Sequence, residues 1–290
     1  WSNFIGSEVM KHVGIRLLAT AVILGVSALA AQAADMSSPS IIPAPMDHAP
    51  AAAEGGWYLR GNIGVGIQNP DSITYTPALA GYTLQGSTYE SPAIISAGIG
   101  YQVNPWFRAD LTAQYRTNGA FSYTWYNPDA DPNTAGDQWG ANTFSGRMSS
   151  IVLMANAYAD LGTYAGLTPF VGAGLGYGWH TTSGFMDVGS GFHTGGYGMA
   201  PSHTYGNFAW ALHAGLGYTV SSNLKLELGY TYSNFGDVTQ GTIGCAGAPC
   251  PTYTFKKKNL DSHDLHIGMR WMLQPETPMA YAPEPFTVKN

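Results

Sequence analysis

Eight segments of about ten residues, in which apolar and polar side chains alternate, recur along this chain. Alternation with a period of two residues is typical of a β-strand with one apolar and one polar face. Strands of roughly 9–11 residues, joined by short turns at one end and long loops at the other, are typical of transmembrane barrels. The segments are Trp57–Ile67, Ala93–Val103, Trp106–Arg116, Ile151–Asp160, Thr168–Trp179, Phe208–Thr219, Leu224–Tyr232 and Asp261–Leu273.

Long and short connections follow one another in strict order between these segments. The long connections, of roughly 25 to 30 residues, exceed what a simple hairpin needs, and a soluble sandwich rarely keeps such an order. The sequence therefore predicts an all-β fold, an eight-stranded antiparallel up-and-down transmembrane β-barrel with both termini in the periplasm. The long connections follow Ile67, Arg116, Trp179 and Tyr232, and the short ones are Asn104–Pro105, Leu161–Leu167 and Ser221–Asn223.

The composition fits a membrane protein that crosses the bilayer with strands. Charged residues make up 10% of the chain, against roughly 25% in ordinary soluble domains. The mean hydropathy is −0.06, and only the N-terminus carries a long apolar run, so several membrane helices are excluded. The formal net charge of −6 disfavours nucleic acid as a partner.

The N-terminus reads as a secretory signal. A basic stretch, Met10–Arg16, is followed by an apolar stretch, Leu17–Ala30, and by the small-residue motif Ala31-Gln32-Ala33. This order predicts cleavage after Ala33. An uncleaved membrane anchor fits less well because the apolar stretch is short. Residues 1–33 are thus expected to be an upstream extension, Trp1–Val9, plus the signal peptide.

Three further regions follow the signal. Residues 34–55 form a Pro/Ala-rich linker, residues 56–273 the outer-membrane barrel, and residues 274–290 a Pro-rich tail whose prolines preclude another membrane strand. Cys245 and Cys250 are expected to form a disulfide, which an exported protein permits. A bridge that closes so short a loop would order only a loop tip.

Charged residues of both signs fall on the polar face of the predicted strands, which a membrane barrel turns inward while apolar residues such as Leu111 and Ile267 face lipid. The inward charges could line an ion-selective channel. Alternatively they could pair in a closed core, which we favour because eight strands leave an interior that side chains nearly fill. The inward set comprises Arg60, Arg108, Asp110, Arg116, Asp160, Lys225, Glu227, Asp264, His266 and Arg270.

Three stretches of sequence carry a family resemblance: Gly56–Gly64 after the Pro-rich leader, Asn156–Gly162, and Pro169–Gly176. They resemble small outer-membrane β-barrel proteins of alphaproteobacteria, the porin-like surface-antigen family of rhizobia and their pathogenic relatives. The resemblance implies a barrel in the outer membrane of a Gram-negative cell, with lipid, lipopolysaccharide and the barrel-assembly machinery as partners. Some members are surface antigens and some bind haem. Such barrels usually end on an aromatic residue, whereas here the Pro-rich tail follows Leu273.

Histidines in the third long connection are the candidates for a haem site. His180, His193 and His203 lie there beside Tyr197 and Tyr205, and imidazole and phenolate can ligate haem iron. Because their spacing is irregular and the segment is Gly-rich, we favour solvated loop histidines. No cofactor and no metal site is predicted.

No enzyme motif stands out. The chain lacks a Gly-x-Ser-x-Gly elbow, a His-Glu-x-x-His motif and a Cys-x-x-Cys pair. An outer-membrane hydrolase using Ser149 or Ser150 with His213 or His266 is the rival from another class. The favoured function is a non-enzymatic, structural or porin-like barrel with surface-exposed loops, and the alternative is a surface haem-binding or host-binding adhesin.

Overall fold

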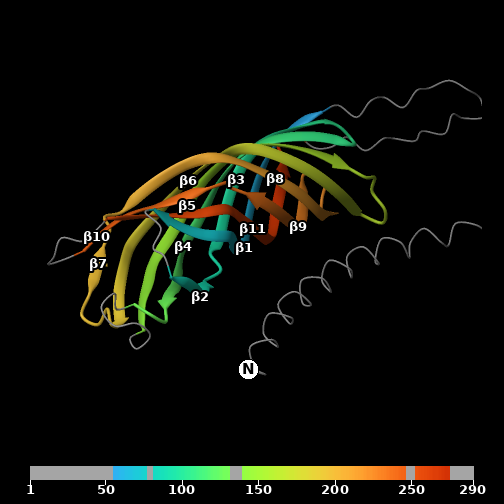
Figure 1. Ribbon diagram of the computed structural model, residues 1–290. Helices are drawn as coiled ribbons and strands as arrows, with labels where there is room; N and C mark the ends of the chain where they lie inside the picture. The colour runs from blue at the N-terminus through green and yellow to red at the C-terminus, as the bar shows by residue number, and fades with distance from the viewer. Residues whose placement is uncertain (1–54, 77–80, 131–138, 246–251, 275–290) are drawn as a thin grey trace, which may run out of the picture. The chain divides into compact units, whose positions relative to one another are not determined.

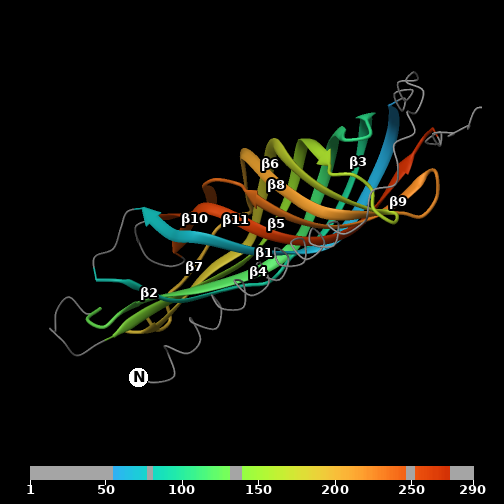
Figure 2. The same ribbon diagram turned by 90° about the vertical axis from the view of Figure 1, so that its right-hand side faces the viewer.

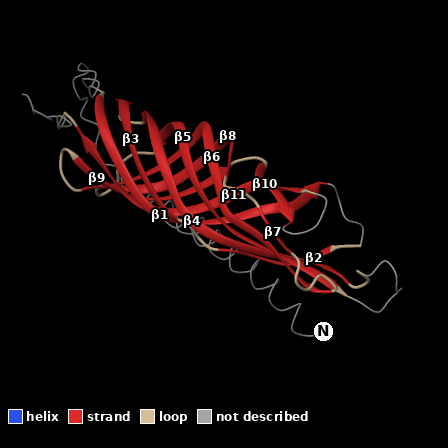
Figure 3. Ribbon diagram, turned by 90° about the vertical axis from the view of Figure 1, so that its left-hand side faces the viewer, coloured by secondary structure: helices blue, strands red, loops and turns tan. Residues whose placement is uncertain are grey.

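The computed structural model describes residues 55–76, 81–130, 139–245 and 252–274. Strands account for every regular element in these ranges (Figure 3). None of the described residues belongs to a helix long and apolar enough to cross a membrane. The strands are β1 (Gly56–Thr76), β2 (Thr83–Tyr89), β3 (Ala93–Asn104), β4 (Phe107–Asn127), β5 (Gly140–Asp160), β6 (Leu167–Gly191), β7 (Tyr197–Met199), β8 (His203–Thr219), β9 (Leu224–Asn234), β10 (Val238–Cys245) and β11 (Tyr253–Met272).

Eight of these strands pair into a closed antiparallel ring, and Figure 1 shows the curved wall to which they belong. The order is β1, β3, β4, β5, β6, β8, β9, β11 and back to β1. Ile63, for example, lies opposite Ile95 on β3 and opposite Ile267 on β11. Because β1 pairs on both sides, this part of the sheet has no free edge, which a barrel in lipid requires. The predicted eight-stranded barrel is confirmed.

The strands are longer than the sequence predicts. β4 and β5 have 21 residues each and β6 has 25, about twice the length needed to cross a bilayer. The expected segments form the half of the barrel next to the short turns, called the proximal half below. Most of the residues expected in long loops continue the sheet as a distal half, where β2 pairs with β4, and β7 and β10 lie between β6 and β11 (Figure 2).

In the proximal half the outer surface is apolar. Leu111, Leu226 and Ile267 point outward and are 62%, 47% and 57% exposed, while their neighbours in sequence turn into the barrel. Aromatic side chains border this apolar band: Trp57 and Trp271 near the short turns, and others at the distal rim. An apolar exterior around a polar interior is the arrangement expected of a barrel in lipid.

In the distal half the sense of the faces reverses. A bulge between Arg116 and Gly119 shifts the alternation of β4 by one residue. Odd-numbered residues such as Leu111 point outward before the bulge, and Phe121 points inward after it. Similar switches on β6 and β11 coincide with positive φ values of 58° at Gly184 and 48° at Asn259.

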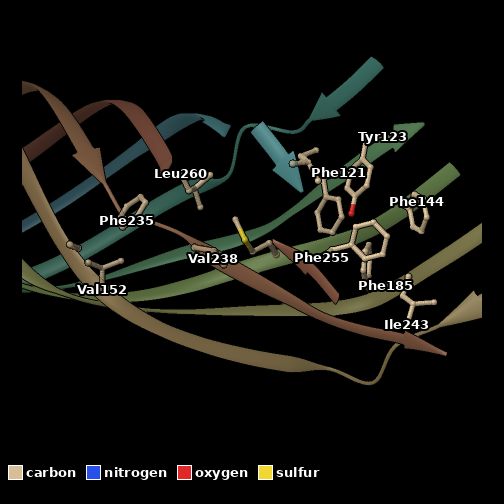
Figure 4. Close-up of a cluster of buried hydrophobic side chains, with 13 residues drawn as sticks. Phe121, Tyr123, Phe144, Val152, Phe185, Phe235, Val238, Ile243, Phe255 and Leu260 are labelled. Atoms are coloured by element: carbon tan, nitrogen blue, oxygen red, sulfur yellow. The ribbon is translucent and has the colours of Figure 1, made fainter. Parts of the chain in front are cut away.

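As a result, the interior of the distal half is apolar. Figure 4 shows the rings of Phe121, Tyr123, Phe144 and Phe255 gathered there from different strands. The Phe144 and Phe255 rings are 4.5 Å apart between centroids, which is a favourable packing distance. This distal cluster comprises Ile73, Phe121, Tyr123, Phe144, Met148, Val152, Phe185, Ala209, Phe235, Val238, Ile243, Phe255 and Leu260.

Several predictions fall outside the described residues. These are the upstream extension and signal peptide at residues 1–33, the linker up to residue 54, and the Pro-rich tail from residue 275. The expected disulfide also lies outside them, because Cys250 and the side chain of Cys245 are not described.

Candidate functional site

The interior of the proximal half is organised around one carboxylate, Glu227 on β9. Its oxygens lie 3.3 Å from Arg60 Nη2 and 3.5 Å from Arg108 Nη2. A third guanidinium, that of Arg270, approaches with its Nε at 3.2 Å. The side chain of Glu227 is 1% exposed. Arginines from β1, β4 and β11 thus converge on one buried anion.

Two aspartates complete the charge balance. Asp110 Oδ2 lies 2.8 Å from Arg60 Nη1. Asp160 lies 3.1 Å from Arg108 Nε and 3.7 Å from Arg270 Nη1. Three arginines and three carboxylates therefore alternate across the barrel, which is how buried ions avoid the cost of standing unpaired. These six residues are called the plug below.

Aromatic and amide groups fill the remaining space around the plug. Arg60 Nη1 donates to the Tyr158 hydroxyl at 2.6 Å, and the Arg108 guanidinium lies 4.1 Å from the Tyr158 ring centroid. Tyr58 donates to Asp110 at 3.1 Å. Cation–π contacts of this kind are strongest where water is excluded. Arg108 is completely buried, so the plug is a dry network.

A second ion pair closes the plug toward the distal half. Arg116 on β4 pairs with Asp264 on β11, and Arg116 Nη1 also donates to Ser262 at 2.8 Å. The guanidinium lies 4.9 Å from the centroid of the Phe235 ring, a member of the distal cluster. Polar packing thus passes directly into apolar packing along the barrel axis.

The sequence-predicted interior residues lie on the inner face of the barrel. Arg60, Arg108, Asp110, Arg116, Asp160, Glu227, Asp264 and Arg270 are buried. Lys225 and His266 are half-buried on the same face. Tyr58 and Tyr158 join the plug although no sequence motif marks them. Their inward position follows from the same alternation as that of Arg60.

The three haem candidates do not come together. The expectation of His180 in a loop is wrong: it lies on β6 inside the barrel, fully buried, with its Nδ1 2.8 Å from Ser150 Oγ. His193 lies in the turn between β6 and β7 and hydrogen-bonds with Tyr82 at 2.5 Å. His203 begins β8. Among the described residues, no group of three or more His, Cys, Asp or Glu could hold a metal ion.

The serine–histidine pairs considered for a hydrolase also differ from expectation. Ser150 pairs with His180 rather than with His213 or His266. His213 instead hydrogen-bonds with Thr231 at 2.9 Å. Ser150 and His180 are 3% and 0% exposed, and no carboxylate within the described part of the chain is bonded to that imidazole. A substrate cannot reach this pair in the folded barrel.

Comparison with known proteins gives consistent matches. Residues 19–271 match the family described as outer membrane protein beta-barrel domain. An uncharacterised protein of Brucella abortus (strain 2308) is 30% identical over 238 residues, which cover 71% of this chain and 76% of the relative. A candidate adhesin of Rickettsia bellii (strain OSU 85-389) is 26% identical, over 74% of this chain and 87% of the relative.

Solved structures with a similar fold include two bacterial surface barrels. Neisserial surface protein A superposes with a TM-score of 0.44 and 16% identity, covering 74% of this chain and 96% of that protein. The outer membrane protein OprG from Pseudomonas aeruginosa gives a TM-score of 0.45 and 13% identity, covering 77% and 98%.

Proposed function

This chain belongs to the outer-membrane protein β-barrel domain family, and from that premise we propose that it is a sealed, non-enzymatic barrel that anchors a surface-exposed β-structure. The proximal half would cross the outer membrane, and the distal half would stand outside the cell. Both chain ends of the barrel lie at the end with the short turns, which supports a periplasmic position for both termini.

The convergence of three arginines on Glu227 carries this proposal. In an open pore, water solvates each charged group, and the charges can remain apart. Here the charged side chains of the plug are between 0% and 4% exposed and pair with one another. Beyond the plug, the distal cluster fills the interior with apolar side chains. Two different kinds of packing therefore oppose the passage of ions.

Planar-bilayer conductance of the refolded barrel tests the proposal. We expect no steady conductance from the native chain. The double variant Arg108→Ser, Glu227→Ser keeps the charge balance but removes two large side chains from the plug, so it should conduct more than the native protein. A native protein with a steady, ion-selective conductance equal to that of the double variant would contradict a sealed barrel.

The non-enzymatic part of the proposal is supported by the burial of the Ser150–His180 pair. A serine hydrolase needs its nucleophile accessible beside a base that a third group orients. A Ser150→Ala variant should therefore leave any hydrolytic activity of the purified protein toward ester substrates at the background level of the native chain. An ester hydrolysis that disappears in this variant would overturn this part.

Adhesion is the second candidate function, favoured by an apolar patch on the outer face of the distal half. Met186 and Val188 on β6 lie opposite Met199 and Tyr197 on β7, and all four side chains are more than two-fifths exposed. Exposed apolar patches mark interaction surfaces. The Rickettsia bellii relative is itself a candidate adhesin.

Adherence of bacteria that display the barrel tests this candidate. Val188→Asp combined with Met199→Asp should lower attachment to cultured animal cells several-fold. Leu84→Asp is the matched control, because Leu84 is also an exposed distal residue but lies on β2, away from the patch. Equal attachment of the native and patch variants would exclude the patch.

A further inference from the structure

The wall of the distal half contains an unpaired strand edge at β2. This strand pairs with β4 and with no other described strand. β1 pairs with β3 only as far as Val65, and its stretch beyond Gly66 pairs with β11 alone among the described strands. β1 and β2 follow one another in the chain but lie apart at the distal end of the barrel (Figure 2). Each of them therefore presents one edge without a described neighbour.

A hydrogen bond at the end of β2 shows which of its backbone groups face the free edge. Glu90 N donates to Ala120 O at 2.8 Å, so the backbone groups of Glu90 point toward β4. In an antiparallel pair this direction alternates from one residue to the next, and the register is unbroken from Tyr89 to Gly86. The N–H and C=O groups of Tyr89 and Ser87 therefore point away from β4. An exposed edge of this kind is a template for another strand.

The opposite edge, on β1, is a poorer template. Gly66 N donates to Pro92 O at 3.0 Å, so by the same alternation every second residue of β1 up to Pro70 faces the side on which β3 pairs. Proline has no N–H to donate and is found in sheets chiefly on edge strands. Pro70 thus interrupts the row of donors on β1. β2 is consequently the edge on which a further strand would pair.

The inner side of the β2 edge is accessible and lies beside aromatic rings. Ser87 lies opposite Tyr123 and shares its face, yet Ser87 is exposed whereas Tyr123 is 1% exposed. The rings of Tyr75 on β1 and Trp125 on β4 meet edge to face, with centroids 4.7 Å apart. Both rings, and that of Tyr89, are only partly buried against the distal cluster. Apolar side chains of an added strand would pack on these rings.

The two faces of the edge specify the kind of strand that fits. On the outer face Thr88 is exposed and lies opposite Ser122, so an added strand would turn polar side chains outward and apolar ones inward. A second copy of β2 does not meet this requirement, because its inner face would bring Ser87 rather than an apolar side chain to the rings. The edge therefore suits a segment of a different protein.

We propose that β2 binds an extended segment of another protein by strand addition, with the segment antiparallel to β2 and its apolar side chains turned toward Tyr75 and Trp125. The backbone groups of Ser87 and Tyr89 supply the hydrogen bonds, and the rings select alternating apolar side chains. This edge is separate from the plug and from the apolar patch on β6 and β7. Binding there requires neither a sealed barrel nor adhesion through that patch.

Binding of a synthetic peptide to the full refolded chain in lipid vesicles tests the proposal. The probe has the sequence of Gly119–Asn127, because this segment of β4 already pairs with β2 on its other side and alternates aromatic and hydroxyl side chains. When its aromatic side chains point inward, the backbone nitrogens of the same residues face β2. The control peptide is methylated on those nitrogens, at the positions of Phe121, Tyr123 and Trp125, and keeps every side chain.

The native protein should bind the unmethylated peptide at least about tenfold more tightly than the methylated one, a difference of roughly 1.4 kcal/mol. Equal binding of the two peptides by the native protein overturns the proposal without recourse to any variant.

Two substitutions at one position then locate the edge. Ser87→Pro removes an N–H that points away from β4, and proline is tolerated at such positions, so the barrel should fold and peptide binding should fall at least about tenfold. Ser87→Ala keeps the N–H and should bind like the native chain. Unchanged binding in Ser87→Pro, with heat-modifiable migration in gels confirming that it is folded, overturns the assignment to β2. Self-association of the native chain that disappears in Ser87→Pro would assign the edge to a second copy and overturn the assignment to another protein.

Discussion

Replacing Glu227 with glutamine should destabilise the barrel more than any other single neutralisation in the plug. The substitution preserves size and shape but removes the one anion that contacts three arginines. Three buried cations would then share two carboxylates, Asp110 and Asp160. Removing one partner of a buried ion pair costs about 3–5 kcal/mol because the other charge stays buried and uncompensated.

Urea unfolding of the refolded protein in lipid vesicles measures this cost. With a denaturant slope of roughly 1–3 kcal/mol/M, the loss lowers the unfolding midpoint by about 1 M or more. Glu90→Gln is the matched control, because Glu90 is exposed and a surface change of this kind alters stability by about 0.5 kcal/mol or less. Adding Arg270→Met to Glu227→Gln restores the charge balance and should recover part of the stability. A native midpoint in Glu227→Gln, together with altered ion selectivity in bilayers, would show that water solvates these charges and that the plug is not sealed.

Three further outcomes are expected. Ile267→Arg places a charge at the centre of the apolar band and should cost about 2–4 kcal/mol, and an unchanged unfolding free energy in vesicles would mean that this face does not meet lipid. Burial lowers the pKa of Lys257 from 10.5 to about 7. Between these two pH values the unfolded chain binds one more proton than the folded chain, so the free energy of unfolding rises with pH. The difference in unfolding free energy between the native chain and Lys257→Met should therefore change with pH in that window and be constant below it. Reducing the predicted Cys245–Cys250 disulfide should leave refolding of the barrel intact, and a reduced chain that fails to refold would show that the bridge stabilises more than a loop tip.

The proximal half of the fold could be predicted from the sequence because apolar and polar residues that alternate with a period of two indicate a strand with one apolar face. On β4, Leu111 and its alternate neighbours face outward as predicted, and Arg108 and Asp110 face inward. Alternation also indicates that inward charges of both signs must pair. It does not say which ones, because partners depend on the stagger of all eight strands around the barrel. Arg60 and Glu227 are separated by 167 positions in the chain.

The sequence does not predict the distal half, for a different reason. Phe121, Tyr123 and Trp125 alternate with polar residues as regularly as any predicted strand. The sequence predicts a loop there because a strand of the length needed to cross a membrane already ends at Arg116. The bulge that follows can be recognised only from the pairing of β4 with β5: the three steps from Arg116 to Gly119 face the two steps from Ser150 to Met148, so β4 carries one extra residue. For the same reason the sequence predicts His180 in a loop, although β6 continues through it.

Along β4, β6 and β11 the apolar face changes from the outside of the barrel to the inside, so the two halves of the wall suit different surroundings. In the proximal half the outer face is apolar and the inner face carries charges. In the distal half the arrangement is that of a protein in water, with phenylalanines inside and hydroxyls such as those of Ser122 and Thr124 outside. Moving the distal half into hydrocarbon would bury those hydroxyls, and moving the proximal half into water would expose its leucines, so both movements cost free energy. The extra residue at the β4 bulge therefore marks the boundary between the part of the barrel wall whose surface suits lipid and the part whose surface suits water.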